Sequence, residues 1–385
     1  MPPLIKTTKA TKSQVRQHNR QLVLRSVYTE AATSRAALAL ETGLTKPAVS
    51  DLVNELIEEG LLVEEGLGES TDIGGKRPRL LRFLPDARQV IGVSVNQNSI
   101  IGVLINLDGE VIAEHAADLP TTRQDEVITA LVEVINGLIA QLHAPLLCLS
   151  VGISAIVDAN GTILHAPRFG WQQVALGDLL ADHYGAPVHI ANSSELAALA
   201  QYTFGAVKDV SSLVTIMISN SIGMGAVMDS AAHHLGNEIG HLTLADSESA
   251  TLSDVLGWRE VRARALVFGR QYGSALLSDE DVTYLTIRYA FVNGDPAAQA
   301  LLTELARHLA RIFAWVIGLM RPQHISLAGA IADLGEPFLA LTVDHTRQLV
   351  LPELVDQTAF SVDDTPNLVA IGAAARSVQL ELGLV

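Results

Sequence analysis

The sequence predicts an α/β protein that carries a winged helix-turn-helix unit at its amino-terminal end. Helical periodicity dominates up to Gly60 and is followed by two short strand-like runs, whereas strand-like and helical segments alternate from Val90 onward. The 385 residues exceed the usual size of a single hydrophobic core. We therefore expect a first domain over residues 1–84 and a second over 85–385, the latter divided into two lobes.

Three helices are expected in the first domain. Apolar residues recur at helical spacing over residues 14–28, Ser34 is placed to cap a second helix, and Thr45 is placed to cap a third. Gly43 lies in the turn between the second and third helices, where a backbone with positive φ is needed. Pro47 fits the first turn of the third helix, since no hydrogen bond is lost there.

A wing is expected after the third helix. Two strand-like runs, 61–63 and 80–83, flank a glycine-rich segment over residues 74–78. The third helix presents short or polar side chains of the kind that read base edges in the major groove, and the wing supplies basic residues for a phosphate or the minor groove. The candidate DNA-binding residues are Arg35, Thr45, Lys46, Pro47, Ala48, Ser50, Asn54, Lys76 and Arg77.

The charge distribution favours nucleic-acid binding only near the amino-terminal end. Residues 1–88 hold 13 Lys and Arg against 11 Asp and Glu, whereas the remaining residues hold 13 against 31. Six basic residues precede the first acidic residue, Glu30, so this end attracts phosphates most strongly. The alternative is a three-helix packing module whose polar residues are only solvated.

The composition excludes several classes of protein. The apolar runs are far shorter than the roughly 20 residues of a membrane span, and residues 1–12 lack the apolar core of a secretory signal. The single cysteine, Cys148, excludes an intramolecular disulfide and a thiolate-rich zinc site, and its strand-like surroundings predict a buried packing residue. We expect a cytoplasmic protein with no membrane contact.

The second domain is expected to begin after a short linker at residues 85–88. The strand pair at 212–229 repeats the hairpin organisation at 90–105, which indicates two related lobes around a cleft. The expected strands are 90–95, 100–105, 111–115, 146–153, 187–191, 212–218, 223–229 and 323–327. The expected helices are 125–142, 176–184, 194–203, 296–320, 335–350 and 367–382.

Six parts of the chain follow one family's pattern. They are Gly43-Leu-Thr-Lys-Pro-Ala-Val-Ser50, Gly74-Gly-Lys-Arg-Pro78, Val151-Gly-Ile-Ser154, Pro167-Arg-Phe-Gly-Trp171, Asn192 and Glu238-Ile-Gly-His241. The chain thus resembles, over nearly its entire length, the ROK family of repressors and sugar kinases, and most closely its branch of xylose and N-acetylglucosamine repressors. The resemblance implies an actin-like (ribonuclease H-like, sugar kinase) ATPase-type fold, operator binding as a homodimer or higher homo-oligomer, and control by a sugar or sugar derivative.

The phosphate loop and the catalytic base of the family's kinases are not recognisable here. The position of the loop holds Ser94-Val-Asn-Gln-Asn98, which has no glycine and no carboxylate to hold phosphate or metal. The base is the aspartate of an Asn-Asp pair, whereas this chain has Asn192 followed by Ser193, and we expect Glu195 on another face of the helix. The resemblance therefore implies a degenerate sugar kinase without catalytic activity and without a cofactor.

The family's zinc loop is also missing. Relatives follow the Glu-x-Gly-His motif with a cysteine-rich loop, whereas no cysteine follows His241, so we expect no metal. The resemblance assigns effector binding to Asn192, Ser193, Glu238 and His241. The alternatives are that Asn192 only caps a helix, Glu238 is a solvated charge and His241 is satisfied within the fold. Trp171 is expected to pack in the core rather than to stack on a sugar.

Together these features predict a DNA-binding transcriptional regulator of carbohydrate genes, a repressor controlled by a sugar effector. Its partners are then double-stranded operator DNA, the effector and further copies of the chain. Two alternatives stay open: a sugar kinase with a DNA-binding head, and a regulator whose body only dimerises or contacts another protein. The sequence identifies neither the effector nor the operator.

Overall fold

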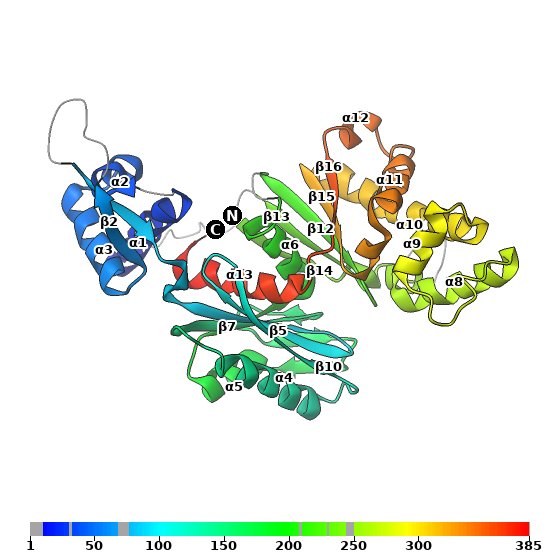
Figure 1. The fold of residues 1–385 in the computed structure, drawn as a ribbon, viewed down its shortest axis with the longest axis horizontal. Coiled ribbons are helices and arrows are strands. Elements are labelled where there is room, and N and C mark those ends of the chain that lie inside the picture. Colours follow the sequence, from blue (N-terminus) through cyan, green and yellow to red (C-terminus); the bar gives the residue numbers. More distant parts are fainter. Residues whose placement is uncertain are drawn as a thin grey trace, which may run out of the picture.

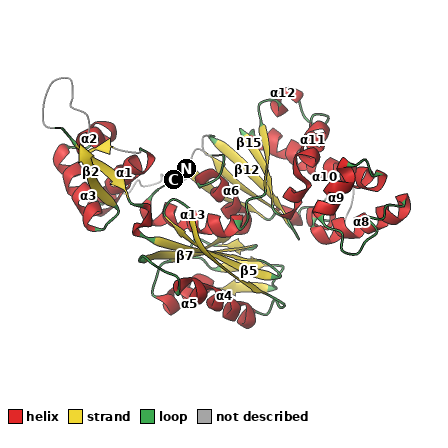
Figure 2. Ribbon diagram, viewed as in Figure 1, coloured by secondary structure: helices red, strands yellow, loops and turns green. Residues whose placement is uncertain are grey.

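The computed structural model describes residues 11–30, 33–67, 77–207, 210–228, 231–243 and 250–384, except for the side chains of 231–237. Figure 1 shows a small head at one end, a lobe whose sheet lies beneath helix α13, and a second lobe that continues into a group of helices at the far end. Helices and strands are mixed in both lobes (Figure 2). The predicted α/β class is confirmed.

The head has the three predicted helices and the two strands of the wing. Its elements are α1 (Lys12–Thr29), β1 (Thr33–Ser34), α2 (Arg35–Thr42), α3 (Lys46–Glu58), β2 (Leu62–Leu67) and β3 (Arg79–Phe83). Ser34 and Thr45 accept backbone N–H groups at the starts of α2 and α3, and Gly43 has the predicted positive φ of 68°. β2 and β3 pair antiparallel, and residues 68–76 between them, including Lys76, lie outside the described residues.

Lobe I is built on a mixed sheet in the order β11-β7-β4-β5-β6. Its strands are β4 (Gln89–Val95), β5 (Ser99–Asn106), β6 (Val111–Asp118), β7 (Leu146–Ile153) and β11 (Val188–Asn192). The outer helices are α4 (Gln124–Ile139) and α5 (Leu176–Tyr184). The sequence did not predict a small sheet of β8 (Ile156–Val157), β9 (Ile163–Ala166) and β10 (Trp171–Val174), because strands of two to four residues carry too little periodicity.

Lobe II repeats the sheet of lobe I, in the order β14-β13-β12-β15-β16. Its strands are β12 (Ser212–Ile218), β13 (Ile222–Met228), β14 (Ala231–Asn237), β15 (His324–Ala328) and β16 (Ala359–Asp363). Both sheets place three antiparallel strands beside two parallel ones, so the predicted repeat is confirmed. The helices of this lobe are α7 (Leu252–Leu256), α8 (Trp258–Tyr272), α9 (Tyr284–Val292), α10 (Pro296–Met320), α11 (Gly335–Thr346) and α12 (Pro352–Val355).

Two helices, α6 (Ser193–Thr203) and α13 (Leu368–Leu382), lie between the two sheets. α13 packs on β4 and β7 of lobe I, α6 packs on β12 and β13 of lobe II, and the two helices pack on each other. α6 is buried along nearly its whole length. This order of layers places the first residues of both helices at the boundary between the lobes.

The head packs directly against lobe I. The expected linker forms a single 3-10 turn (Pro85–Ala87), and the Pro85 carbonyl accepts the N–H of Leu107 at 3.0 Å. One apolar cluster contains buried side chains of the head together with side chains of lobe I and α13. Cys148 belongs to this cluster as a buried residue, as predicted, and burial raises the pKa of its thiol to about 12.

Tyr28 of α1 makes the contact between the head and lobe I sensitive to high pH. Its hydroxyl donates a hydrogen bond to Asp108 in the turn between β5 and β6. Burial, then the charge of Asp108 and this hydrogen bond, raise the pKa of Tyr28 to about 12 from its ordinary 10.0. A raised pKa in the folded state gives stability that is complete below the unfolded value and is lost as the pH rises toward the folded one.

Between roughly pH 9 and 11 we expect the unfolding free energy of the wild type to fall by about 1 kcal/mol more than that of Tyr28→Phe, after allowance for solvent screening. Urea denaturation at each pH measures this difference. Tyr272→Phe, which changes a tyrosine that is 47% exposed, should follow the wild type. Parallel curves for Tyr28→Phe and the wild type would contradict the assignment.

Candidate functional site

The exposed face of α3 presents most of the candidate DNA contacts. The opposite face is buried in the core of the head, so the helix is fixed with this surface outward. Among the candidates, Lys46, Pro47, Asn54 and the wing residue Arg77 are exposed, and Ala48 and Ser50 are half-buried. Thr45 is exposed as well, but its hydroxyl accepts the N–H of Ala48 at 3.4 Å and therefore serves as a helix cap.

Arg35 is part of an internal network that holds this surface. Its guanidinium donates to the Ser50 carbonyl at 3.0 Å and to Asn54 Oδ1 at 2.9 Å, and it pairs with Glu64 of β2 at 2.8 Å. Burial alone would raise the pKa of Glu64, but hydrogen bonds and charge from Arg35 and Arg79 outweigh it and lower the pKa. Arg35 thus joins α2, α3 and the wing, and it occupies the side-chain oxygen of Asn54.

Two basic residues of α1 are neutralised within the head. Arg16 pairs with Glu55 of α3, and Arg20 pairs with Glu59, which caps the end of α3, each at 2.5 Å. These ion pairs join α1 to the α3 region and partly neutralise the two positive charges. The basic residues before Lys12 lie outside the described residues.

A cleft with a cavity of about 350 Å³ lies between the lobes. The lobe I wall includes Ser94, Asn96 and Gln97, from the segment that stands at the kinase phosphate loop, together with Ser193 and Ser194 at the start of α6. This segment forms a tight turn in which Asn96 N–H donates to the Ser99 carbonyl at 2.8 Å. The lobe II wall includes residues 219–223, which form the turn between β12 and β13 and the start of β13, together with residues that follow β15 and β16.

Three of the four candidate effector residues lie close together: Asn192 and Glu238 are hydrogen-bonded, and His241 is within ion-pair distance of Glu238. Asn192 is buried, and its Nδ2 donates to the Ala155 carbonyl at 3.0 Å and to Glu238 Oε1 at 2.9 Å, while its Oδ1 accepts the Ser194 N–H at 2.8 Å. His241 Nε2 lies 3.7 Å from Glu238 Oε2. Asn192 therefore caps α6 and also orients Glu238, and the Glu238 side chain, only 20% exposed, is not simply solvated.

The fourth candidate, Ser193, lies in the cleft itself. It is 4% exposed and is the first residue of α6. Glu195 faces a separate cavity on lobe I with Arg376, at 3.8 Å, as its partner, which agrees with the expectation that it lies on another face of the helix. The effector roles of Asn192, Ser193, Glu238 and His241 stay predictions.

Arg168 and three aspartates of the cleft were not predicted from the sequence. Arg168 Nη2 donates to the Asn220 carbonyl at 3.0 Å and so connects the lobes, and burial lowers its pKa despite the nearby charges of Glu238 and Asp254. The aspartates Asp333, Asp363 and Asp364 line the lobe II side. Arg168 lies within a segment that matched the family pattern, but nothing in its spacing pointed to the cleft.

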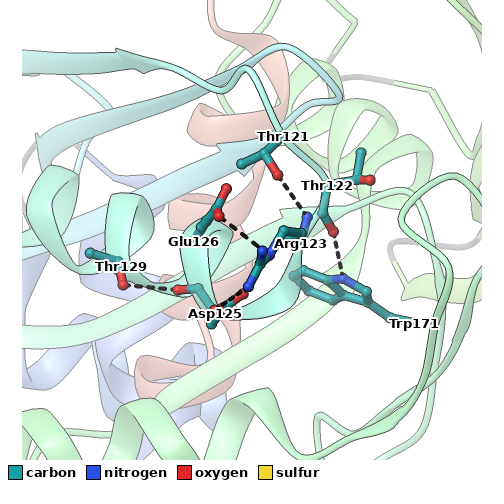
Figure 3. Close-up of polar contacts among 7 residues, drawn as sticks. All are labelled: Thr121, Thr122, Arg123, Asp125, Glu126, Thr129 and Trp171. Carbon is teal, nitrogen blue, oxygen red and sulfur yellow. Dashed lines mark hydrogen bonds and ion pairs between the residues drawn. The ribbon is translucent and has the colours of Figure 1, made fainter.

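Trp171 packs as predicted. Its indole is 4% exposed, meets Phe169 at a centroid distance of 5.1 Å, and donates to the Thr122 carbonyl at 3.1 Å. Figure 3 shows this bond beside the start of α4, where Arg123 pairs with Asp125 and Glu126. Trp171 thus ties β10 to the segment before α4.

The described part of the chain contains no group of three or more His, Cys, Asp or Glu side chains suited to a metal ion. Residues 244–249, which follow the Glu-x-Gly-His motif, lie outside that part. The expected absence of zinc stays a prediction. Among the helices described, none is both long and apolar enough to cross a membrane.

These features define a class: a winged helix-turn-helix head on a two-lobed body of the actin-like kind. The chain belongs to the ROK family, because the model described as "ROK family" matches residues 90–374. The resemblance noted in the sequence is thereby confirmed.

The chain is similar to named repressors along most of its length. The xylose repressor of Caldicellulosiruptor bescii is 28% identical over 345 residues, which cover 84% of this chain and 86% of the relative. The DNA-binding transcriptional repressor Mlc of Escherichia coli (strain K12) is 22% identical over 374 residues, which cover 91% and 92%.

Solved structures give the same fold. A ROK family transcriptional regulator described as a homolog of the E. coli Mlc protein matches with a TM-score of 0.84 and 24% identity, over 96% of this chain and 97% of that one. A ROK family glucokinase from Streptomyces griseus, in complex with glucose and AMPPNP, matches with a TM-score of 0.67 and 21% identity. The glucokinase match covers 99% of that enzyme and 76% of this chain.

Proposed function

We propose that this chain is a DNA-binding transcriptional repressor of carbohydrate genes whose body binds a sugar or sugar derivative. The observation that carries the proposal is that a head with a capped recognition helix is joined to a body in which Asn192, Glu238 and His241 lie close together, next to Ser193 of the interlobe cleft. Similarity to repressors over both the head and the body supports it. The head would read operator DNA, and the group around Glu238 would bind sugar hydroxyls.

The head would act in pairs. A recognition helix reads only a few base pairs, so we propose a homodimer whose two heads bind half-sites separated by whole helical turns. On this proposal Lys46, Ser50 and Asn54 contact base edges, and Arg77 of the wing contacts a phosphate.

DNA binding is tested by fluorescence anisotropy with labelled duplexes from the chain's own promoter. Binding through about 6–10 phosphate contacts should weaken roughly a thousandfold or more between about 50 and 200 mM salt. A scrambled duplex of equal length serves as the control. Absence of binding at low ionic strength, or binding that salt does not change, would refute the proposal.

The body is proposed to have lost phosphoryl transfer. A sugar hydroxyl needs a base to take its proton, and the serine at position 193 has no charge at neutral pH to do so. The aspartates of the cleft belong to its opposite wall. Glu195 faces a different cavity.

We expect the wild-type protein to release ADP at the background rate with every pentose and hexose of a panel. Ser193→Asp should also stay at background, because the turn at residues 94–98 offers no glycine-rich cradle for phosphate. A coupled ADP-release assay, with an active ROK glucokinase as the positive control, measures both. Sugar-dependent ADP release by the wild type would show that the chain is an enzyme.

A further inference from the structure

Helix α13 reaches from the interlobe cleft to the head. Its first residues, Leu368 and Val369, line the cleft, directly after Asn367 in a left-handed conformation with a φ of 56°. The 15 residues of the helix span about 22 Å. The other end lies against the head, next to α1 (Figure 1).

One face of α13 belongs to the same apolar cluster as the head. Four residues spaced four apart, Ala370, Ala374, Val378 and Leu382, are buried in this cluster, and Leu384 joins them beyond the end of the helix. The buried head residues of the cluster are Val23, Leu24, Val27, Leu38, Val49, Leu52, Val53, Leu56, Leu61, Leu62, Leu81 and Phe83. The core of the head is therefore completed by the body.

The backbone of α13 is in direct contact with both neighbouring layers, the lobe I sheet and helix α6. A Cβ on Gly92 of β4 would overlap the Ala370 carbonyl of α13, and a Cβ on Gly372 of α13 would overlap the Leu196 carbonyl of α6. Backbones in direct contact leave no room for the helix to shift alone. When the angle between the lobes changes, α13 must therefore move together with one of the two layers that it contacts, β4 of lobe I or α6.

The contact with the head is less tight and is made through a side chain. Gly383 ends α13 with a φ of 68°, and a Cβ there would come within 2.6 Å of the Gln21 side chain of α1. Two further contacts join the head to lobe I: Arg88 Nη2 donates to the Glu59 carbonyl at 2.9 Å, and Tyr28 bonds to Asp108.

We propose that α13 couples the interlobe cleft to the head, so that a change in the cleft alters the packing of α1 and thereby the orientation of the recognition helix. This inference deepens the proposed function and rests on it for the role of the head. The coupling is carried by packing at both ends of one helix, with no flexible linker between the sites. Thermodynamic reciprocity requires that a disturbance at either end is felt at the other.

The test uses the full-length protein without DNA or sugar and measures backbone hydrogen exchange. Leu368→Ala disturbs the cleft end and should raise the exchange rates of α1 amides at least threefold. Gly383→Ala disturbs the head end and should raise the rates of the amides at residues 219–222, across the cleft, by a similar factor. Exchange in the buried middle of α10 should stay unchanged in both variants, which excludes global destabilisation.

Matched controls separate contact from backbone strain. Gly273 ends α8 with a φ of 71° and has no heavy atom within 4 Å of an added Cβ, so Gly273→Ala carries the strain without the contact and should change neither site. Gln21→Ala combined with Gly383→Ala should restore the wild-type rates. Effects confined to the mutated end, or equal effects of Gly383→Ala and Gly273→Ala, would overturn the coupling. Because no DNA or sugar is used, either result leaves the anisotropy test of the proposed function independent.

Discussion

Arg35→Ala is expected to weaken binding to the promoter duplex at least tenfold. The substitution removes the guanidinium that fixes the Ser50 carbonyl and Asn54 Oδ1, and it leaves the half-buried carboxylate of Glu64 with one cation fewer. A recognition helix whose polar side chains are no longer held in place loses the geometry that base contacts require. Anisotropy titration at constant salt measures the loss.

Two further variants distinguish a positional role of Arg35 from the effect of its charge. Arg82→Ala removes a cation of the wing that pairs with Glu65 at 2.6 Å and is half exposed, so it removes equal charge without touching α3 and should weaken binding far less. Asn54→Ala should reduce the difference in affinity between the promoter and scrambled duplexes. It should not weaken binding to both duplexes equally. If Arg35→Ala and Arg82→Ala weakened binding equally, Arg35 would act only through its charge.

Glu238→Gln is expected to weaken sugar binding at least tenfold and to leave DNA binding without sugar unchanged. The amide keeps the shape of the side chain but removes the charge that accepts strong hydrogen bonds from sugar hydroxyls. In one orientation of the amide, its NH₂ group faces Asn192 Nδ2, which now donates to Glu238 Oε1. In the other orientation, the amide oxygen accepts from Asn192 and is turned away from the ligand. Calorimetric titration measures the affinity. The sugar used is the one that raises the melting temperature of the wild-type protein most.

Glu114→Gln, on the exposed strand β6, is the matched control and should bind the sugar as the wild type does. An undiminished sugar affinity in Glu238→Gln would remove the group around Asn192 from the effector site. The site would then have to be sought among the residues that line the interlobe cleft, beginning with Arg168.

Much of the fold was predictable because its signals are local. The caps Ser34 and Thr45, the turn glycine Gly43 and the apolar periodicity of α10 each depend on residues within one or two turns. The hairpin of β4 and β5, repeated as β12 and β13, predicted the two lobes. The short strands β8, β9 and β10 and the four-residue helix α12 carried too few residues for a periodic signal.

The sites were less predictable, because they depend on contacts between distant segments. The family pattern pointed to Asn192 and Glu238, and the structure places them within hydrogen-bond distance across 46 residues. No local pattern could show that Arg35 is engaged by Ser50 and Glu64, or that Arg168 reaches the Asn220 carbonyl. The continuity of the head with α13 was equally invisible, since Gly383 and Gln21 lie at opposite ends of the chain.

The central claim is that a kinase-like body controls a DNA-reading head, and calorimetric titration of the active sugar into the free protein and into its complex with promoter DNA tests it most directly. If sugar and DNA binding are coupled, the two affinities must differ by the same factor by which the sugar changes DNA affinity, commonly about 5–150-fold. We predict weaker sugar binding by the DNA complex. Equal affinities in the two titrations would contradict the account.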